Sequence, residues 1–533
     1  MLYAIIFVSG AAVLALELLA SRIMTPYFGV SLYIWTGILS ITLVALALGY
    51  WAGGRFAGFR SGASVERLTQ LFALMPAAAA FAIVAACLAY PYLFAGLAAM
   101  DLVLGAFAAC LILLFVPLVA VSAMNPLLVA ILLARGAGRG GDAGAGRVFF
   151  VSTIGSVAGV LVTAFGLIPN FSNFSATLTV ALMLALLSLA AAVRAPASLG
   201  ARRKLGLAAG GATLAAALML WQADAYVGRM WPANHGGRTW RVEARINSLF
   251  GTVKILRSDP DPVTGGFVRI YFQDGLIQNT VASDGRSLSY YTYALEALAH
   301  AYRPQIEHAL VLGLGAGIVP MRFAERGVPV DAVEIDPASL AAAQRYFGFD
   351  PSRVRVELAD ARTQLRRCAR RYDVIIVDLF HGDGIPDYLV TRDFFNDLRR
   401  CLTADGIAVF NTFADLALPD AYAHLLATVR AELPHIVLYR PEWPGSAHVN
   451  SFLVASVRPL PPARPVALDH VVPQHAATLA AMLARPQALH RGLLEHGEIV
   501  TDARNRGVHD IAETQANYRR AMVESLPRAF LLN

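Results

Sequence analysis

Three glycines alternate with single other residues directly after a short apolar run in the C-terminal half of the chain. The run Ala309–Leu312 leads into Gly313, Gly315 and Gly317. A short, continuous apolar run is typical of a buried parallel strand. Glycines after such a strand permit a tight turn into a helix and let a ligand approach the backbone closely. The spacing therefore predicts a strand, a glycine-rich turn and a helix, with a ligand held against the turn.

Acidic residues follow the next predicted strands. Glu334 lies 21 residues after Gly313, which is the spacing at which a carboxylate reaches the hydroxyls of a bound ribose. Because the carboxyl ends of parallel strands meet at one crevice, residues at these ends should line a single site. Any one acid could instead cap a helix or close a turn, but recurrence at successive strand ends favours a nucleoside site. The further candidates in this group are Asp336, Asp360, Ala361 and Asp378.

The glycine pattern separates two classes of nucleotide-binding domain. A dinucleotide fingerprint has the form GxGxxG, whereas this chain has GxGxG. The latter resembles the S-adenosylmethionine-dependent transferases, and the resemblance implies that Asp360 reads the adenine amino group. We therefore expect an α/β Rossmann-like domain of the class I S-adenosylmethionine-transferase type.

The composition of the chain is not that of one soluble protein. Of its 533 residues, 57% are hydrophobic and 15% are charged, and the mean hydropathy is +0.54. Soluble domains carry about 25% charged residues. The apolar excess lies in residues 1–221. The net charge of +7 does not indicate a nucleic-acid partner, because much of the excess arginine lies in short links between apolar runs, as in membrane proteins.

Seven apolar runs are long enough, at roughly 20 residues, to cross a lipid bilayer. Basic links follow the second, fourth and sixth runs, and the positive-inside rule places these links in the cytoplasm. The runs are 2–24, 31–53, 69–89, 102–134, 148–169, 174–193 and 205–222.

The side of the membrane on which the C-terminal half lies depends on the number of spans that precede it. Seven spans that start in the cytoplasm would place that half outside, yet a nucleoside substrate is made in the cytosol. Three solutions are open: the run 205–222 does not cross, the run 102–134 crosses twice, or the C-terminal half faces out. We expect a multi-pass protein of the inner cell membrane with a cytoplasmic C-terminal half.

Two features of the apolar runs bear on packing or function. Glu17 lies in the middle of the first run. Ionisable groups inside a membrane are costly and often functional, and the simpler alternative is an ion pair with Arg22 or a contact with a neighbouring helix. Gly155 and Gly159 form a GxxxG pattern, which predicts close helix packing.

The cysteines form no CxxC pair and have no metal-site spacing, so we expect neither a disulfide framework nor a metal centre. Two lie in apolar runs and two in the C-terminal half. They are Cys87, Cys110, Cys368 and Cys401.

Further motifs resemble the spermidine synthase (polyamine aminopropyltransferase) family over residues 243–413. The stretch 269–278 is similar to the family's LxLDGxxQ motif and ends in Gln278. Tyr291 lies in a segment that fits the YHEM helix, and the stretch 378–391 fits the DSSDPxGPAxxLFT gate. The first apolar runs resemble bacterial proteins that fuse several spans to such a domain.

The resemblance implies an enzyme of polyamine biosynthesis with a putrescine-like amine acceptor, and it also implies a homodimer. Asp502 lies in a segment similar to the family's TDDxxP motif, where it would line the site or cap a helix. Three departures concern the donor amine and the acceptor: Ala316 and His381 each replace an Asp, and Thr292-Tyr293 replace His-Glu. We infer that Ala316 would tolerate the carboxylate of S-adenosylmethionine itself.

The chemistry expected of this site is displacement at a sulfonium carbon. A sulfonium donor is already activated, so the protein mainly places a nucleophile in line behind that carbon. Asp378 is the candidate general base for an amine, or else it binds the amine of the donor. Asp383 and His381 would orient the acceptor or share its proton. Tyr291 would form the acceptor wall or donate a hydrogen bond.

These inferences predict a multi-span α-helical membrane domain of about seven helices (1–224), the small β N-terminal part of a spermidine-synthase-like domain (225–283) and a Rossmann-like nucleoside-binding catalytic domain (284–533). The expected reaction is amine attack, inter- or intramolecular, on the propyl carbon of S-adenosylmethionine or its decarboxylated form, releasing methylthioadenosine. Two alternatives are a small-molecule methyltransferase on the same fold and a non-catalytic transporter or sensor that binds a nucleoside or polyamine.

Overall fold

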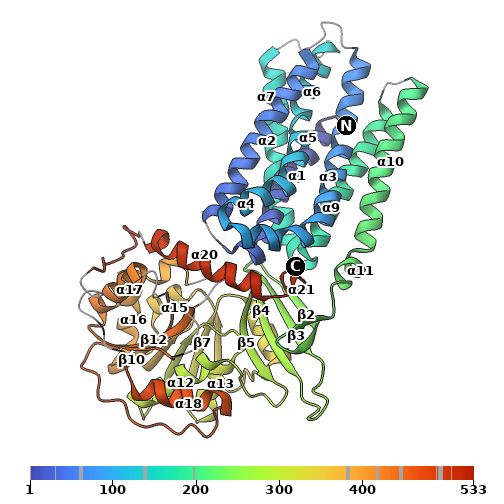
Figure 1. Cartoon of the computed structure of the whole chain (residues 1–533). Helices are drawn as coiled ribbons and strands as arrows, with labels where there is room; N and C mark the ends of the chain where they lie inside the picture. The colour runs from blue at the N-terminus through green and yellow to red at the C-terminus, as the bar shows by residue number, and fades with distance from the viewer. Residues whose placement is uncertain are drawn as a thin grey trace. The chain divides into compact units, whose positions relative to one another are not determined.

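The computed structural model contains two compact units (Figure 1). The first comprises Met1–Ala233 with Arg520–Asn533, and the second comprises Asn234–Arg519. The second unit contains both the small β part and most of the Rossmann-like part. The domain boundaries expected at residues 224 and 283 stay predictions. The structure describes residues 2–30, 32–58, 64–135, 141–195, 198–379, 385–415, 419–442, 448–487, 489, 496–505 and 507–532.

The first unit is helical. Its long helices are α1 (Leu2–Phe28), α2 (Leu32–Gly58), α3 (Val65–Met100), α7 (Gly141–Val162), α9 (Asn173–Arg194) and α10 (Leu199–Trp221). Between α3 and α7 lie α4 (Leu102–Cys110), the π-helical turn η1 (Leu111–Phe115), α5 (Val116–Ser122) and α6 (Met124–Ala134). The short elements are η2 (Thr163–Leu167), α8 (Ile168–Asn170), α11 (Ala223–Gly228) and α21 (Arg528–Leu531).

Within the described residues, seven helical segments are long and apolar enough to cross a membrane, one at each of the seven expected runs. The segment Leu102–Ala134 is one of them. Its joints at Leu111, Val116 and Ala123 keep right-handed helical dihedral angles, so this segment is one continuous helical path. It is not the pair of antiparallel spans that the sequence left open.

Glycines bring α1 and α7 into close contact. A Cβ atom added to Gly155 would overlap the carbonyl oxygen of Phe7, and one added to Gly159 would overlap that of Ala11. Ser156 Oγ donates a hydrogen bond to the carbonyl oxygen of Gly10 across the same interface, at 2.9 Å. The close packing predicted from the GxxxG pattern is therefore confirmed, because the backbones meet where no side chain separates them.

The second unit begins with a five-stranded antiparallel sheet. A two-residue turn, Asp274-Gly275, joins β4 to β5, and both residues have positive φ, 47° and 93°, as a tight hairpin requires. The Asp274 carboxylate accepts a hydrogen bond from the Thr252 N–H at 3.0 Å and so ties this turn to β3. The strands, in spatial order, are β1 (Ala233–His235), β2 (Arg238–Asn247), β3 (Thr252–Ser258), β4 (Val268–Gln273) and β5 (Leu276–Ala282).

A seven-stranded sheet of order β11-β12-β10-β9-β6-β7-β8 forms the centre of the unit. Strands β8, β7, β6, β9 and β10 are parallel, whereas β12 is antiparallel to β10 and β11. This is the expected Rossmann-like arrangement. The strands are β6 (Ala309–Leu312), β7 (Val330–Glu334), β8 (Arg355–Leu358), β9 (Tyr372–Val377), β10 (Leu402–Asp415), β11 (His435–Tyr439) and β12 (His448–Ser456).

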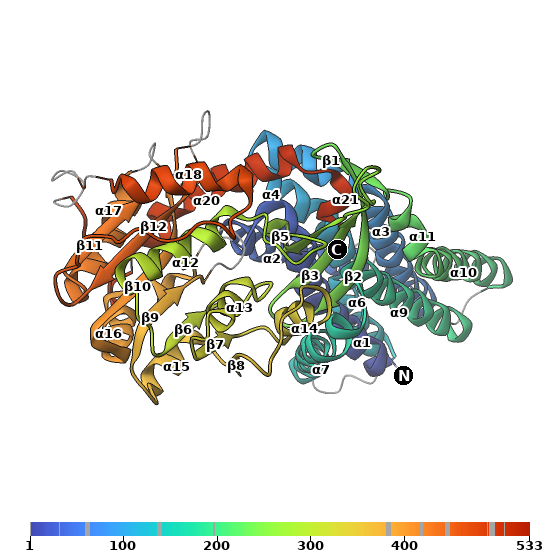
Figure 2. The same cartoon turned by 90° about the horizontal axis from the view of Figure 1, so that it is seen from below.

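Helices cover both faces of this sheet, which explains why its strands read as continuous apolar runs. Along β6, Val311 packs into a cluster with α12, α13 and α18, whereas Leu312 packs into a second cluster with α15, α16 and α17. Figure 2 shows α12 and α18 on one side of the sheet and α15 and α16 on the other. The helices are α12 (Tyr290–Tyr302), α13 (Ile318–Glu325), α14 (Pro337–Tyr346), α15 (Ala361–Arg367), α16 (Arg392–Cys401), α17 (Pro419–Glu432), α18 (Pro473–Ala484) and α20 (Gly507–Ser525), with a 3-10 turn η3 (Asp387–Leu389).

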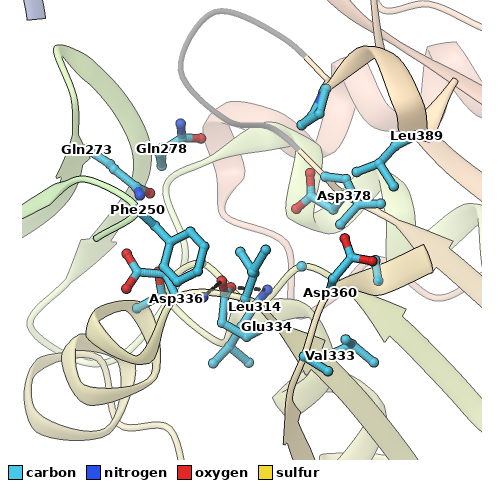
Figure 3. Close-up of a pocket in the computed structure, with 18 of the residues that line it drawn as sticks. Phe250, Gln273, Gln278, Leu314, Val333, Glu334, Asp336, Asp360, Asp378 and Leu389 are labelled. Carbon is cyan, nitrogen blue, oxygen red and sulfur yellow. Dashed lines mark hydrogen bonds between the residues drawn. The ribbon is translucent and has the colours of Figure 1, made fainter. Parts of the chain in front are cut away.

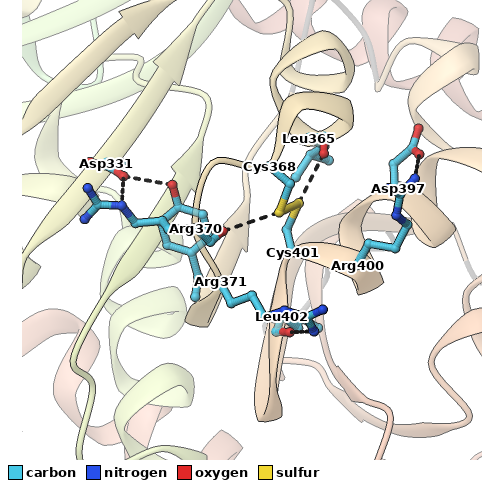
Figure 4. The surroundings of a disulfide bond; sticks show 10 residues. Asp331, Leu365, Cys368, Arg370, Arg371, Asp397, Arg400, Cys401 and Leu402 are labelled. Atoms are coloured by element: carbon cyan, nitrogen blue, oxygen red, sulfur yellow. Dashed lines mark hydrogen bonds and ion pairs between the residues drawn. A yellow bond between two sulfur atoms is a disulfide. The ribbon is translucent and has the colours of Figure 1, made fainter.

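The sequence predicted no disulfide framework, and the described part of the second unit contains one disulfide bond. Cys368 and Cys401 form a disulfide, with their Cα atoms 5.6 Å apart (Figure 4). Cys368 follows α15 and Cys401 ends α16, and these two helices pack side by side. This pair was not predictable from the sequence, because 33 residues separate the two cysteines and only the packing of α15 on α16 brings them together.

The α1–α7 interface should not tolerate a side chain at Gly155. We expect Gly155→Val to lower the thermal unfolding temperature in detergent, because overpacking costs about 1–3 kcal/mol and the obstacle here is backbone. Gly146→Val on the same helix is the matched control, since a Cβ atom there meets nothing within 4 Å. Equal unfolding temperatures for the two variants would contradict the packing described.

The disulfide predicts a pattern of thiol reactivity. When the full chain is unfolded without reductant, iodoacetamide should modify Cys87 and Cys110, and it should modify Cys368 and Cys401 only after reduction. Mass spectrometry of the digested protein measures this directly. In the Cys401→Ser variant, Cys368 should become reactive without reductant. Modification of Cys368 in the unreduced parent protein would show that the bond is not formed.

Candidate active site

The glycine turn after β6 has the conformation that the sequence predicted. Gly313, Gly315 and Gly317 have φ values of +94°, +53° and +77°, a region that favours glycine. A Cβ atom on Gly313 would overlap the carbonyl oxygen of Asp378, and one on Gly317 would collide with the ring of Phe349. Gly317 caps the start of α13. The turn therefore combines a close approach to the end of β9 with an abrupt entry into a helix.

A cavity of about 400 Å³ lies at the carboxyl ends of these strands (Figure 3). In Figure 3, Asp336 lies on one side of it, Asp360 and Asp378 lie on the other, and Glu334 lies between them. The cavity is of the size that small ligands occupy. Candidate residues from the sequence that line it are Gln278, Tyr291, Gly313, Gly315, Glu334, Asp336, Asp360, Ala361 and Asp378.

Glu334 is fixed to the glycine turn by backbone hydrogen bonds. Its carboxylate accepts the N–H of Leu314 at 3.0 Å and the N–H of Asp336 at 2.8 Å. Burial raises the pKa of Glu334, and these hydrogen bonds oppose part of that rise. Each carboxylate oxygen can accept more than one hydrogen bond, so the side chain can also accept a ligand hydroxyl.

Asp336 and Asp360 each cap a helix while also lining the cavity. Asp336 Oδ1 accepts the N–H of Ala338 at 2.9 Å, and Asp360 Oδ1 accepts the N–H of Thr363 at 2.8 Å. The Tyr388 hydroxyl donates to the other Asp360 oxygen at 2.8 Å. Burial alone would raise the pKa of Asp360, but these hydrogen bonds lower it overall. Asp336 and Asp360 therefore each cap a helix and line the cavity, two roles that the sequence left as alternatives.

Asp378, at the end of β9, is held by a relay of amides. Asn411 Nδ2 donates to Asp378 Oδ1 at 2.8 Å, and Asn450 Nδ2 donates to Asn411 Oδ1 at 2.8 Å. Burial raises the pKa of Asp378 to about 6, although the Asn411 hydrogen bond opposes the shift. A carboxylate with this pKa is mostly ionised at neutral pH and is still basic enough to accept a proton.

Asn279 connects the small sheet to the glycine turn. Its Nδ2 donates to the Tyr291 hydroxyl at 2.8 Å, and its Oδ1 accepts the N–H of Ala316 at 3.2 Å. Burial, together with the charge of Asp378, raises the pKa of Tyr291 well above its usual range. The Ala316 side chain is buried in an apolar cluster with Val253 and is not among the residues lining the cavity.

The remaining candidates lie elsewhere. His381 and Asp383 fall within residues 380–384, outside the described residues. Asp502 is paired with Arg362 at 2.9 Å and accepts the Thr391 hydroxyl at 2.8 Å; Arg362 lowers its pKa. Asp502 thus joins α15 to the start of α16 and does not line the cavity. The described part of the chain has no group of three His, Cys, Asp or Glu side chains that could hold a metal ion.

Sequence reasoning missed several cavity residues and their supports. Asn411 left a signal, because it is a buried polar residue inside the apolar strand β10, and such a residue requires a partner. The sequence does not show that Asn411 pairs with Asp378, nor what Asn279 does, because both depend on which strands lie next to each other. Further lining residues not singled out from the sequence are Phe250, Tyr271, Gln273, Asn279, Ser339 and Tyr388.

Comparison with known proteins agrees with this geometry. Residues 289–432 match the spermine/spermidine synthase domain. The polyamine aminopropyltransferase of Vibrio vulnificus is 36% identical over 174 residues, which cover 31% of this chain and 57% of that protein. The human eEF1A lysine and N-terminal methyltransferase is 32% identical over 167 residues, covering 28% of this chain and 23% of that protein.

Among solved structures, a probable spermidine synthase from Corynebacterium glutamicum covers 47% of this chain and 98% of its own, with a TM-score of 0.37 and 19% identity. The chain thus spans little more than half of the Vibrio relative. The part of the second unit that contains the glycine turn, Glu334 and Asp378 is similar to the spermine/spermidine synthase domain.

Proposed function

We propose that this protein is a membrane-embedded transferase that uses S-adenosylmethionine or its decarboxylated form and releases methylthioadenosine. One observation carries the proposal: a single cavity joins a carboxylate fixed to a glycine turn, Glu334, with a buried carboxylate of raised pKa, Asp378. The name of the Vibrio relative, polyamine aminopropyltransferase, supports this type of reaction.

The nucleoside would occupy the glycine-turn side of the cavity. Glu334 would accept the ribose hydroxyls, since its position is set by two backbone N–H groups. Asp360 would accept the adenine amino group, and Gln278 would face the nucleoside from the small sheet. Gly313 and Gly315 would let the ligand lie close to the backbone. The sulfonium end would then point toward Asp378 and Tyr291.

The transfer step would be an in-line displacement. The lone pair of an amine nitrogen attacks the propyl carbon, the C–S bond breaks, and its electron pair stays on sulfur as a neutral thioether. The amine must lose a proton, and Asp378 would accept it. Asn411 and Asn450 would hold Asp378 in position for this role. The raised pKa of Asp378, about 6, suits a base that works near neutral pH.

The acceptor would be a putrescine-like amine for decarboxylated donor. With S-adenosylmethionine itself, the donor's own amine could be the nucleophile in an intramolecular reaction. The side chain of Ala316 is small and places no charge beside the glycine turn. It therefore repels neither of the two donors. Similarity to the human methyltransferase favours a second candidate, methyl transfer with release of S-adenosylhomocysteine.

We propose further that the first unit spans the inner membrane. Its seven apolar segments support this, as do large apolar side chains that point outward from the helices. In a soluble protein such a surface would aggregate. Examples of these exposed side chains are Leu43, Trp51, Phe150, Phe165 and Leu207.

The helix count bears on the side of the membrane. The basic residues Arg55, Arg135 and Arg194 lie at the ends of the second, fourth and sixth segments, so alternation places them at one end of the bundle. Segment Leu102–Ala134 counts once, and α10 then ends at the other end. We therefore propose that the second unit faces away from the cytoplasm, so that a donor made in the cytosol would have to cross the membrane to reach it. The cytoplasmic location expected from the origin of the donor is the alternative. The Cys368–Cys401 disulfide supports the location away from the cytoplasm, because such bonds persist in oxidising compartments.

The reaction has a direct test. Detergent-purified full chain is incubated with each donor, with and without putrescine, and nucleoside products are identified by mass spectrometry. We expect methylthioadenosine, and we expect Asp378→Asn to lower its rate at least about 100-fold, the contribution of a general base. The rate of the parent protein should rise with pH through about 6, since the ionised carboxylate is the active form.

The control is Asp405→Asn, which removes an exposed acid of the same unit and should leave the rate unchanged. Absence of methylthioadenosine from either donor would refute the proposed reaction. Appearance of S-adenosylhomocysteine instead would establish the methyltransferase, and absence of both products would leave a binding protein.

Sidedness can be tested with a membrane-impermeant maleimide on intact spheroplasts. Val263→Cys in the second unit should be labelled, because Val263 is 93% exposed. Leu199→Cys, at the start of α10 and 88% exposed, should be labelled only after the membrane is opened. The reverse pattern would place the second unit in the cytoplasm.

A further inference from the structure

A second cavity, of about 240 Å³, lies inside the helical bundle of the first unit. Residues of α1, α2, α5, α6 and α7 line it. Its most polar side chain is that of Glu17, near the middle of α1. The wall around Glu17 mixes hydroxyl and amide groups with apolar side chains, which is unusual in a bundle made otherwise of apolar helices.

Among the described residues, no arginine, lysine or histidine forms an ion pair with Glu17, so the structure shows no ion pair with Arg22 of the kind considered from the sequence. Thr42 shares a side-chain hydrogen bond with the Glu17 carboxyl group. A carboxylate in low dielectric is costly unless a positive charge or hydrogen-bond donors compensate it. The side chain therefore presents to the cavity a carboxyl group that has one hydrogen-bond partner, Thr42, and no ion pair among the described residues.

Three of the other polar side chains that line the cavity donate hydrogen bonds to neighbouring groups. Ser156 Oγ donates to the carbonyl oxygen of Gly10 at 2.9 Å, and Ser122 Oγ donates to that of Val119 at 3.2 Å. Asn125 Nδ2 donates to Ser152 Oγ at 3.3 Å. Hydroxyl oxygens keep lone pairs after donating. The cavity thus offers one carboxylate and several hydroxyl oxygens as hydrogen-bond acceptors to a group that donates.

The size of the cavity and its apolar lining distinguish between a bare metal cation and an ammonium group. A bare metal cation requires several oxygen ligands at about 2.0–2.6 Å, and a cavity of about 240 Å³ with one carboxylate does not surround an ion so closely. Tyr50 and Phe149 pack edge to face with ring centres 5.5 Å apart and both line the cavity. Aromatic faces attract ammonium groups, and Leu14 and Leu46 would contact methylene groups.

We propose that this cavity is a binding site for a primary alkylammonium ion, with its –NH3+ group on Glu17 and its alkyl chain against the apolar wall. An ammonium group has three donors and no acceptor, which matches the lining. The proposal does not require the second unit to be catalytic, although an amine is also the expected nucleophile there. It makes the bundle a recognition element for amines as well as an anchor.

The test uses n-butylamine and the full chain in detergent at fixed ionic strength. Butylammonium should raise the thermal unfolding temperature of the parent protein and of Asp378→Asn, and it should not raise that of Glu17→Gln. Glu66→Gln, which neutralises an acid on α3 that does not line the cavity, is the matched control and should keep the effect. Equal stabilisation by sodium chloride would overturn the proposal in favour of an unspecific cation effect.

A second measurement keeps the proposal testable if Glu17→Gln does not fold. A hydrophobic carbodiimide should modify Glu17 in the parent protein, and butylammonium should slow this modification at least several-fold. Glu66 serves as the internal reference in the same digest. Loss of the amine effect in Asp378→Asn would assign the binding to the second unit. Unchanged modification of Glu17 with amine present would refute the site.

Discussion

The cavity of the second unit depends on the close approach of two strand ends. Gly313 has no side chain, so the backbone of Asp378 at the end of β9 lies directly against the turn after β6. This contact brings the backbone N–H groups that hold Glu334 and the buried carboxylate of Asp378 to one cavity. Any side chain at Gly313 would separate the two groups, and with them the proposed nucleoside position from the proposed proton acceptor. The sheet and its helices form the layers of the unit, whereas the close approach of Gly313 to the backbone of Asp378 forms the site.

The residues that support Asp378 show where sequence reasoning stops. The glycine turn and the acids at strand ends were predictable, because each pattern is local and follows from strand and turn preferences. The Asn411–Asn450 relay was not, because it joins β10 to β12 through their antiparallel register. The Cys368–Cys401 bond depends on the packing of two helices in the same way. The roles of His381 and Asp383 stay predictions.

The seven apolar segments were predictable for a physical reason. A span must bury about 20 residues of backbone in hydrocarbon, so hydropathy alone locates it. The cavity beside Glu17 was not predictable, since its lining comes from five helices. Both units place a carboxyl group in a region of low dielectric, where it would interact strongly with a positive group. Asp378 and Glu17 are the two positions at which we propose that the protein binds an amine.

The central claim is that one cavity holds the nucleoside with its sulfur directed at Asp378. The most direct measurement is a cryo-electron microscopy map of the full chain with methylthioadenosine bound. We expect density in the cavity of about 400 Å³, with the ribose hydroxyls in hydrogen-bond range of Glu334 and the sulfur on the side of Asp378. Density outside this cavity, or a nucleoside whose ribose lies away from Glu334, would contradict the claim.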